Sequence, residues 1–184
     1  MRILIIVMAL FLSACSSTQS MSIFSFTNSD LESVLNKQLP KFSEKLSVMG
    51  LPVEFGVDEL SAKIGPENRD VIALGVDSSA SVNMFPFNYP VRLMLQVEGS
   101  PFYDSEKKAI FLRNIKLLDS SIDAGSFKGN LGVLNGEVMK VINGFLAVNP
   151  VYELDMDDPK MALISNLPLN IMVSEGAIKL VPNL

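Results

Sequence analysis

The stretch VRLMLQVE at residues 91–98 carries an apolar side chain at every second position, with Arg92, Gln96 and Glu98 on the other face, and it is the clearest indication of the fold. Such a two-residue period is typical of a β-strand that buries one face. A similar pattern runs through residues 53–64, 72–84 and 109–118, and the polar segment Asp104–Lys108 separates two of these predicted strands. Long strands joined by short turns predict an antiparallel meander.

Two other segments carry apolar residues at helical spacing. The first covers residues 29–49, where Ser29 and Glu32 form a capping-box pattern and a proline in the middle predicts a kink. Its length, roughly 30 Å, is long for a domain of this size. The second covers residues 127–148. Helix, strands, helix and a C-terminal hairpin at 169–181 together predict one α+β domain.

The N-terminus has the pattern of a secretory leader. Arg2 precedes an uncharged apolar run at residues 3–12, which is too short to span a bilayer as a helix. The motif LSAC at residues 12–15 resembles the lipobox of bacterial lipoproteins, in which the cysteine is diacylated on sulfur and the chain is cut before it. We therefore expect a signal peptide at 1–14 and a lipid on Cys15 that attaches the chain to a membrane. An ordinary signal peptide is the alternative, but the single cysteine lies at the required position.

The residues after Cys15 are small, polar and uncharged as far as Ser22, which predicts a flexible segment. We accordingly expect a lipidated N-terminus and tether at 15–27 and a single domain at 28–184. Ser16 follows the cysteine directly, whereas lipoproteins held at the inner membrane usually carry aspartate there. This resemblance implies a lipid-anchored protein of the outer membrane that faces the periplasm.

The composition argues against several classes of function. The chain has 15 Lys and Arg against 20 Asp and Glu, a formal charge of −5, so it lacks the basic surface of a nucleic-acid-binding protein. It has no histidine and no acid–base pair with the reach that catalysis needs, so we expect no catalytic residue, no enzyme and no cofactor. Asp155, Asp157 and Asp158 lack the spacing of a calcium loop. They predict a turn that caps a helix before Pro159, rather than a metal site.

Glycines are unusually frequent at the start of the second predicted helix, namely Gly129, Gly132 and Gly136. Each costs about 1 kcal/mol relative to alanine inside a helix, so each needs a reason. Gly132 and Gly136 lie one turn apart on one helix face. Two interpretations stay open: close packing of the helix on the sheet, or a gap left for the chain of a ligand.

Several stretches together carry a family resemblance. They are the helix after Ser29, the segment from Pro101–Asp104 through Ala109–Leu112, then Pro150–Leu154 and Gly176–Leu180. In their order and spacing they resemble the YceB-like lipoproteins. This resemblance implies the fold of TULIP domains, in which a long curved antiparallel sheet wraps around a long N-terminal helix, with a second helix. It also implies lipid binding, and it transfers no site residue except the lipidated cysteine.

We expect a lipid or other hydrophobic ligand in an apolar groove between the sheet and the helices, since burial stabilises a hydrocarbon chain by about 0.8 kcal/mol per CH₂. The candidate residues of its floor and walls are Leu35, Leu39, Phe42, Leu46, Leu93, Leu95, Phe111, Leu134 and Val138. Plain core packing is the alternative for each of them. The alternative function is an anchored interaction module whose sheet edge or aromatic loop at Phe85–Tyr89 docks another envelope protein.

Overall fold

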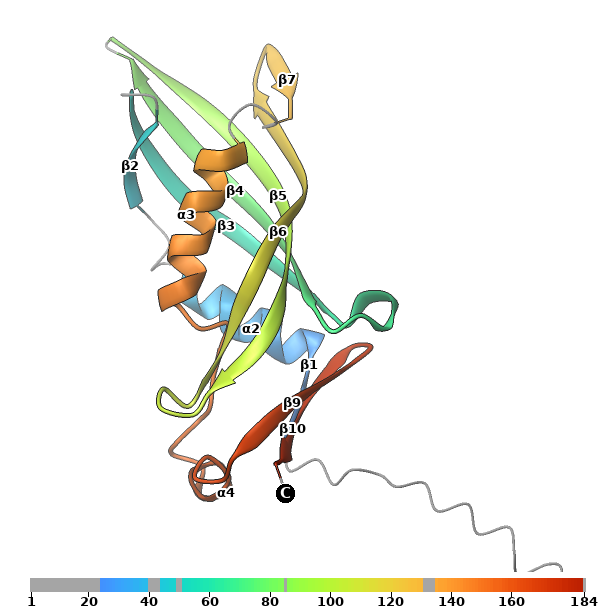
Figure 1. The fold of residues 1–184 in the computed structure, drawn as a ribbon. Helices are drawn as coiled ribbons and strands as arrows, with labels where there is room; N and C mark the ends of the chain where they lie inside the picture. The colour runs from blue at the N-terminus through green and yellow to red at the C-terminus, as the bar shows by residue number, and fades with distance from the viewer. Residues whose placement is uncertain (1–23, 40–43, 49–50, 85, 131–134, 184) are drawn as a thin grey trace, which may run out of the picture.

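The computed structural model describes residues 24–39, 44–48, 51–84, 86–130 and 135–183, which form an α+β domain with two antiparallel sheets (Figure 1). The larger sheet has the order β2 (Glu44–Val48), β3 (Leu51–Ile64), β4 (Ile72–Met84), β5 (Phe87–Asp104), β6 (Ala109–Ala124) and β7 (Phe127–Gly129), and β8 (Tyr152–Glu153) pairs with β6. The smaller sheet has the order β1 (Phe24–Thr27), β10 (Ala177–Pro182) and β9 (Leu169–Ser174). The helices are α2 (Asn28–Gln38), α3 (Asn135–Val148) and α4 (Pro159–Ile164), with a 3-10 turn η2 (Pro66–Asn68).

The larger sheet is curled into a half-barrel, and α2 and α3 lie against its concave face (Figure 1). The predicted meander is confirmed, because β3, β4, β5 and β6 pair with one another in sequence order. The ladders are irregular between Val57 and Glu59 and at two places between β5 and β6. Such bulges bend a strand and increase its twist, so they contribute to the curl.

Polar side chains of α2 complete the edge of β3. β2 pairs with β3 only at residues 51–55, which leaves the other half of β3 beside the helix. Asn36 donates through Nδ2 to the Leu60 carbonyl (2.8 Å) and accepts from the Leu60 N–H (3.0 Å). Glu32 accepts from the N–H of Ala62 through Oε1 (2.9 Å). The helix thereby satisfies backbone groups that a neighbouring strand would otherwise satisfy, and its position on the sheet is fixed.

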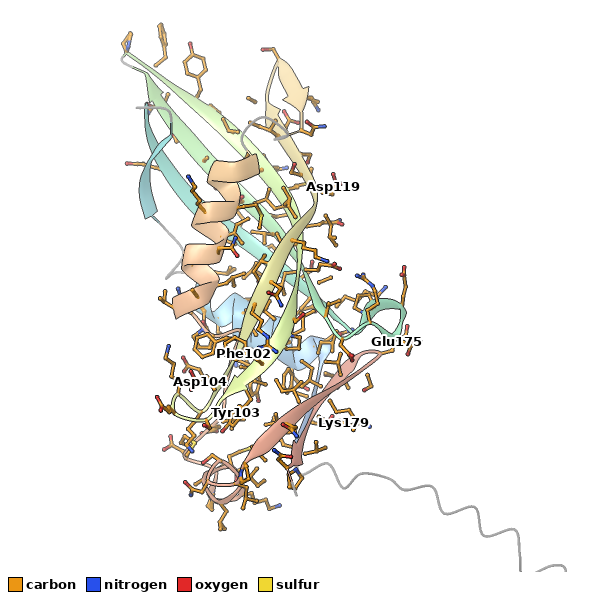
Figure 2. The ribbon with its side chains drawn as sticks, viewed as in Figure 1. Phe102, Tyr103, Asp104, Asp119, Glu175 and Lys179 are labelled. Atoms are coloured by element: carbon orange, nitrogen blue, oxygen red, sulfur yellow. The ribbon has the colours of Figure 1, made fainter. Side chains whose placement is uncertain are left out.

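The two sheets meet where one hairpin turn rests on another. The N–H of Gly176, in the β9–β10 turn, donates to the carbonyl of Ile64 at the end of β3 (2.9 Å). Gly65 has a φ of +60°, and a Cβ built on it would lie 2.5 Å from the carbonyl oxygen of Ser174. Figure 2 shows Glu175 at this tip, beside the η2 turn. The junction therefore needs glycine at residue 65 both for its backbone conformation and for space.

The packed core lies where α2, the smaller sheet and one half of the curled sheet come together. Its most deeply buried side chains are Phe26, Leu31, Ile64, Ile72, Ile110, Ile178 and Leu180. Along the concave face the core reaches as far as Val76 and Val97. We call this part of the molecule the core end. We call the concave-face positions beyond it the far half, which comprises Ser78, Ala80, Val91, Leu93 and Ile122.

The predicted long helix over residues 29–49 is wrong in its second half. α2 has 11 residues, and Glu44–Val48 instead forms β2, which pairs with the beginning of β3. A proline is disfavoured inside a helix, and the hairpin offers the following residues a complete set of backbone partners. The cap also differs from the prediction, because Thr27 is the N-cap and Asp30 completes the capping box. Within the described residues, the long N-terminal helix that the TULIP resemblance implied is therefore not shown, since α2 ends at Gln38.

The second predicted helix begins later than expected. Phe127–Gly129 forms β7 against β6, and α3 starts at Asn135. Gly129 is therefore a strand residue, and Gly132 lies outside the described residues. Gly136 is exposed, and a Cβ there would meet no described atom within 4 Å. Close packing on the sheet therefore does not explain Gly136.

The first strand belongs to the domain rather than to the tether. β1 pairs with β10 from Phe24↔Leu180 to Thr27↔Ala177, and Phe26 is only 1% exposed. Residues 24–27, which the sequence analysis assigned to the tether, therefore form a strand of the smaller sheet.

Candidate ligand-binding face

The far half of the concave face is apolar and lies beyond the main core cluster, although its small side chains Ser78 and Ala80 are themselves buried. The strand register places Ala80 opposite Val91, Ser78 opposite Leu93, and Leu93 opposite Ile122. Directly opposed residues project to the same face of a sheet, so these five form one continuous surface across β4, β5 and β6. Val91, Leu93 and Ile122 are only half-buried, and none of the five belongs to the core cluster.

The second helix covers this surface unevenly. Among the described residues, α3 packs chiefly on β6, and Ile142, Phe145 and Leu146 contact the core (Figure 1). On β4 the concave positions carry small side chains, Ser78 and Ala80. Half-buried Val, Leu and Ile side chains beside small ones are the lining that suits a hydrocarbon chain, because binding removes their remaining apolar surface from water.

Four of the predicted groove residues lie on the described inner side of the fold. Leu93 and Leu95 project together from β5 onto the concave face, where Leu95 is buried and Leu93 is half-buried. Leu35 is buried in the core beneath α2, and Leu39 is half-buried where α2 ends. Of these four, Leu93 therefore lies in the far half, whereas Leu35 is part of the packing of the core end.

Phe111 lies on the other face of the sheet from Leu93. Its neighbours Ile110 and Leu112 both belong to the core, so the alternation of β6 points Phe111 away from it. There it stacks on Phe102, with ring centroids 5.8 Å apart, and is almost fully buried. The structure therefore does not bring Phe111 together with the other predicted wall residues.

The remaining predicted residues keep their status as predictions. Cys15, Phe42 and Leu134 lie outside the described residues. Leu46 belongs to β2 and Val138 to α3, but only their backbone is described.

Two residues of the face, Val91 and Ile122, were missed by the sequence analysis. The alternation that placed Leu93 and Leu95 on one side also included Val91, so a signal for it was available. Ile122 was missed because the predicted strand stopped at Leu118, whereas β6 continues to Ala124.

A separate depression of about 450 Å³ lies open to solvent between β1, α2 and β8. Its lining residues are Phe24, Ser25, Phe26, Asp30, Ser33, Val34, Lys37 and Tyr152, none of which was predicted to bind a ligand. Tyr152 stacks on Phe26 with ring centroids 4.4 Å apart.

The charged rim of this depression has one clearly shifted carboxyl group. Hydrogen bonds from the backbone N–H and the hydroxyl of Thr27 lower the pKa of Asp30. Burial, with the nearby carboxylates of Asp30 and Asp155, raises the pKa of Tyr152. The depression therefore presents an ionised carboxylate and a neutral phenol above an aromatic floor at neutral pH.

The acidic cluster before α4 acts as the predicted helix cap. Asp158 is the N-cap and accepts from the N–H of Lys160 (2.8 Å), while Asp155 accepts from the N–H of Asp157 (3.0 Å). Within the described ranges, no three Asp, Glu, Cys or His side chains are grouped in a way that could hold a metal ion. Within the same ranges, no helix has both the length and the apolar character needed to cross a membrane.

Comparison with known proteins identifies the family. A family model described as "Protein of unknown function (DUF1439)" matches residues 26–177. The chain belongs to the DUF1439 family. Curated relatives of this DUF1439 chain include the uncharacterized lipoprotein YceB of Escherichia coli strain K12, 23% identical over 152 residues, and that of Salmonella typhimurium strain LT2, 24% identical over 152 residues. Each match covers 80% of this chain and 82% of the relative. The predicted family resemblance is therefore confirmed.

Among solved structures, the DUF1439 chain matches the crystal structure of lipopolysaccharide binding protein at a TM-score of 0.29 and 14% identity. The match covers 86% of this chain and 39% of that protein, so the chain spans about two fifths of its length.

The stretches that carried the family resemblance lie side by side at the core end of the DUF1439 fold. Phe102 and Tyr103 of β5 pair with Phe111 and Ile110 of β6, and Tyr152 of β8 pairs with Ile110. Figure 2 shows Phe102 and Tyr103 close to the β5–β6 turn. The resemblance therefore rests on one structural unit of the fold rather than on separate surface features.

Proposed function

We propose that this chain is a lipid-anchored lipoprotein of the outer membrane that holds the hydrocarbon part of a lipid on the far half of its concave face. The observation that carries the proposal is the run of half-buried apolar side chains, Val91, Leu93 and Ile122, beyond the end of the packed core. Covering an acyl segment of five methylenes on such a surface contributes about 4 kcal/mol.

The anchor is supported independently of the binding face. Curated relatives are lipoproteins by name, and the motif LSAC at residues 12–15 provides the cysteine that such proteins acylate. Ser16 in the following position favours transport to the outer membrane. Replacement of Cys15 by serine should release the protein into the soluble periplasmic fraction, and continued attachment to membranes would contradict the anchor.

Binding, rather than turnover, is the activity that this face suits. Its residues are aliphatic apart from Ser78, whose hydroxyl donates to the carbonyl of Leu93 (3.2 Å). The proton of this hydroxyl is engaged with a backbone carbonyl rather than with a general base, so the face offers an apolar surface rather than an activated nucleophile.

The test compares two adjacent residues of β5 that point to opposite faces. Leu93→Asp places a charge on the concave face, whereas Met94→Asp places the same charge on an exposed side chain of the convex face. The full chain is purified with each change, and binding of a fluorescent 16-carbon fatty acid is titrated. We expect Leu93→Asp to weaken binding at least about tenfold and Met94→Asp to leave it unchanged, because a desolvated charge beside a hydrocarbon is strongly unfavourable.

Two further measurements keep this test decisive. Circular dichroism shows whether both variants are folded, and Leu93→Trp serves as a second, space-filling variant that introduces no charge. Native mass spectrometry of the protein from its own host should show a co-purified lipid. Equal fatty-acid binding by Leu93→Asp and Met94→Asp, or a ligand-free mass together with no titratable binding, would overturn the proposed ligand site.

A second candidate function rests on the tip of the β4–β5 hairpin. Phe87 and Tyr89 are 62% and 48% exposed there, with ring centroids 6.4 Å apart. Most of the segment predicted as an aromatic loop belongs to β5, which begins at Phe87. An exposed aromatic pair is typical of a protein-binding surface. A protein partner retained by the wild type and lost from Phe87→Ser, with no lipid in the native mass spectrum, would favour this interaction module instead.

A further inference from the structure

Three apolar side chains are exposed at the core end, on and beside α4. They are Met156, Leu163 and Leu167, and we call them together the α4 surface. Leu163 is 75% exposed, and Leu167 and Met156 are 45% and 44% exposed. Isolated apolar residues on a protein surface are ordinary, but three in one short segment require an explanation.

The segment that carries these side chains is held firmly. Met161 is buried in the core, and Ser165 is buried as well. The Lys108 ammonium group donates to the Ser165 carbonyl, and Asp158 caps the first turn. Leu163 is therefore presented outward by a fixed turn of helix.

The α4 surface lies at the end of the molecule from which the N-terminal segment departs. Pro168, directly after this surface, accepts a hydrogen bond from the N–H of Asn183 just beyond β10 (2.7 Å). Phe24, the first described residue, pairs with Leu180 of the same strand. Figure 1 shows α4 and the C-terminal end of β10 together at this end, opposite the β4–β5 tip.

We propose that the α4 surface rests on the lipid bilayer to which Cys15 anchors the chain, an inference that depends on the proposed anchor. Eight residues separate Cys15 from Phe24, so the tether reaches about 30 Å at full extension. This tether holds the α4 surface close to the membrane, where its high local concentration allows a weak apolar contact to form.

The charges around this surface favour an apolar contact over an electrostatic one. Asp155 and Asp157 are exposed beside Met156, and Lys160 is exposed on α4. This mixture is acidic on balance, so it does not attract anionic headgroups. On vesicles of uncharged lipid the contact should therefore depend little on salt. On vesicles rich in anionic lipid it should be weaker, and added salt should restore it by screening the repulsion.

This contact predicts one orientation of the domain relative to the bilayer. With the α4 surface on the bilayer, the β4–β5 tip points away from it (Figure 1). A membrane contact made through Phe87 and Tyr89 would require the opposite orientation, so a probe at each end distinguishes the two arrangements.

The experiment attaches a fluorophore to one introduced cysteine, because the natural Cys15 does not react once it is acylated. In the acylated protein the Cys15 sulfur is blocked, so a cysteine introduced by Leu163→Cys or by Asn88→Cys is the only free thiol. Each variant carries an environment-sensitive fluorophore and is reconstituted into vesicles of phosphatidylethanolamine and phosphatidylglycerol. We expect iodide quenching to fall roughly twofold for the label at residue 163 and to stay unchanged for the label at residue 88.

A second attachment separates this inference from the anchor itself. An N-terminal hexahistidine tag replaces Cys15 and binds vesicles that contain a nickel-chelating lipid, since the chain has no histidine of its own. Protection at residue 163 in this arrangement supports the α4 surface even if the natural chain proves not to be acylated. Equal quenching at both positions, protection at residue 88 instead, or protection at residue 163 without vesicles would overturn the inference, the last indicating a second copy of the chain.

Discussion

The core end and the far half of the concave face are built from the same strands but are packed differently. At the core end, both sheets and α2 enclose side chains such as Ile110 and Ile178, which are 0% exposed. In the far half, the same β5 and β6 carry Leu93 and Ile122, which keep part of their surface in contact with solvent. The strand alternation is continuous, so the difference arises from what lies over the sheet.

This contrast assigns different tasks to the two regions. At the core end, both sheets and α2 enclose the apolar side chains, so this region contributes most of the free energy of unfolding. Among the described residues, the element that packs near the far half is α3, chiefly on β6, so the half-buried apolar side chains there can be covered further without disturbing the fold. Stability and ligand binding are thereby separated along the length of each strand.

Truncation of a core residue should have the largest effect. Ile178→Ala is expected to lower the free energy of unfolding by about 2–5 kcal/mol, because it leaves a cavity in a fully enclosed site. Leu93→Ala should cost only about 1 kcal/mol, because Leu93 is half-buried and loses less buried surface. Urea unfolding at neutral pH measures both. Equal losses would show that the far half is packed like the core end.

Two glycine-to-alanine substitutions test the same comparison, one at the hairpin junction and one in the β6–β7 turn. Gly65→Ala at the core end should cost about 2–4 kcal/mol, because the new Cβ meets the Ser174 carbonyl at 2.5 Å and the backbone has a positive φ. Gly125→Ala, in the β6–β7 turn, has a φ of +72° but meets no described atom within 4 Å, so only the backbone strain of about 1 kcal/mol remains. Thermal unfolding of the two variants would contradict this prediction if the Gly125 change were the more damaging.

The smallest effect is expected at the capping box of α2, and it depends on pH. The folded-state pKa of Asp30 lies below its usual value, so its stabilising contribution is present above about pH 4 and is lost as the pH falls through the lowered pKa. Asp30→Asn should therefore slightly lower the Tm at pH 7, and the difference from wild type should vanish at strongly acidic pH. Asp123→Asn provides the matching variant near the other end of β6, because hydrogen bonds from Lys128 and from the N–H of Gly125 lower the pKa of the Asp123 carboxyl group. A Tm difference that grows on acidification would refute the assigned sign.

The sheet could be predicted from the sequence because its signal is local. Alternation along residues 91–98 and the polar turn after Asp104 specify a strand and a hairpin without reference to any other part of the chain. The C-terminal hairpin around Gly176 was predicted for the same reason, and this glycine has a positive φ of 76°.

The helices were harder to predict because their ends are decided by tertiary contacts. Glu32 suggested a capping box with Ser29, but its carboxylate instead accepts from Ala62, 30 residues away. Leu46 continued a helical spacing of apolar residues that runs from Phe42 to Met49, yet residues 44–48 form a strand because β3 returns directly beside them. The candidate site was predicted only in part for a related reason: curvature decides which concave residues stay uncovered, and it depends on bulges that no short motif reveals.

The pairing of β1 has a mechanical consequence for an anchored protein. β1 is an edge strand whose four residues pair with β10, and it continues directly into the capped start of α2. Tension applied through the N-terminus along this strand would load its hydrogen bonds together in shear, while Phe26 resists extraction from the interior. Force from a moving membrane would therefore be absorbed at the core end, where the side chains are most fully buried, and the region proposed to carry lipid would remain unstrained.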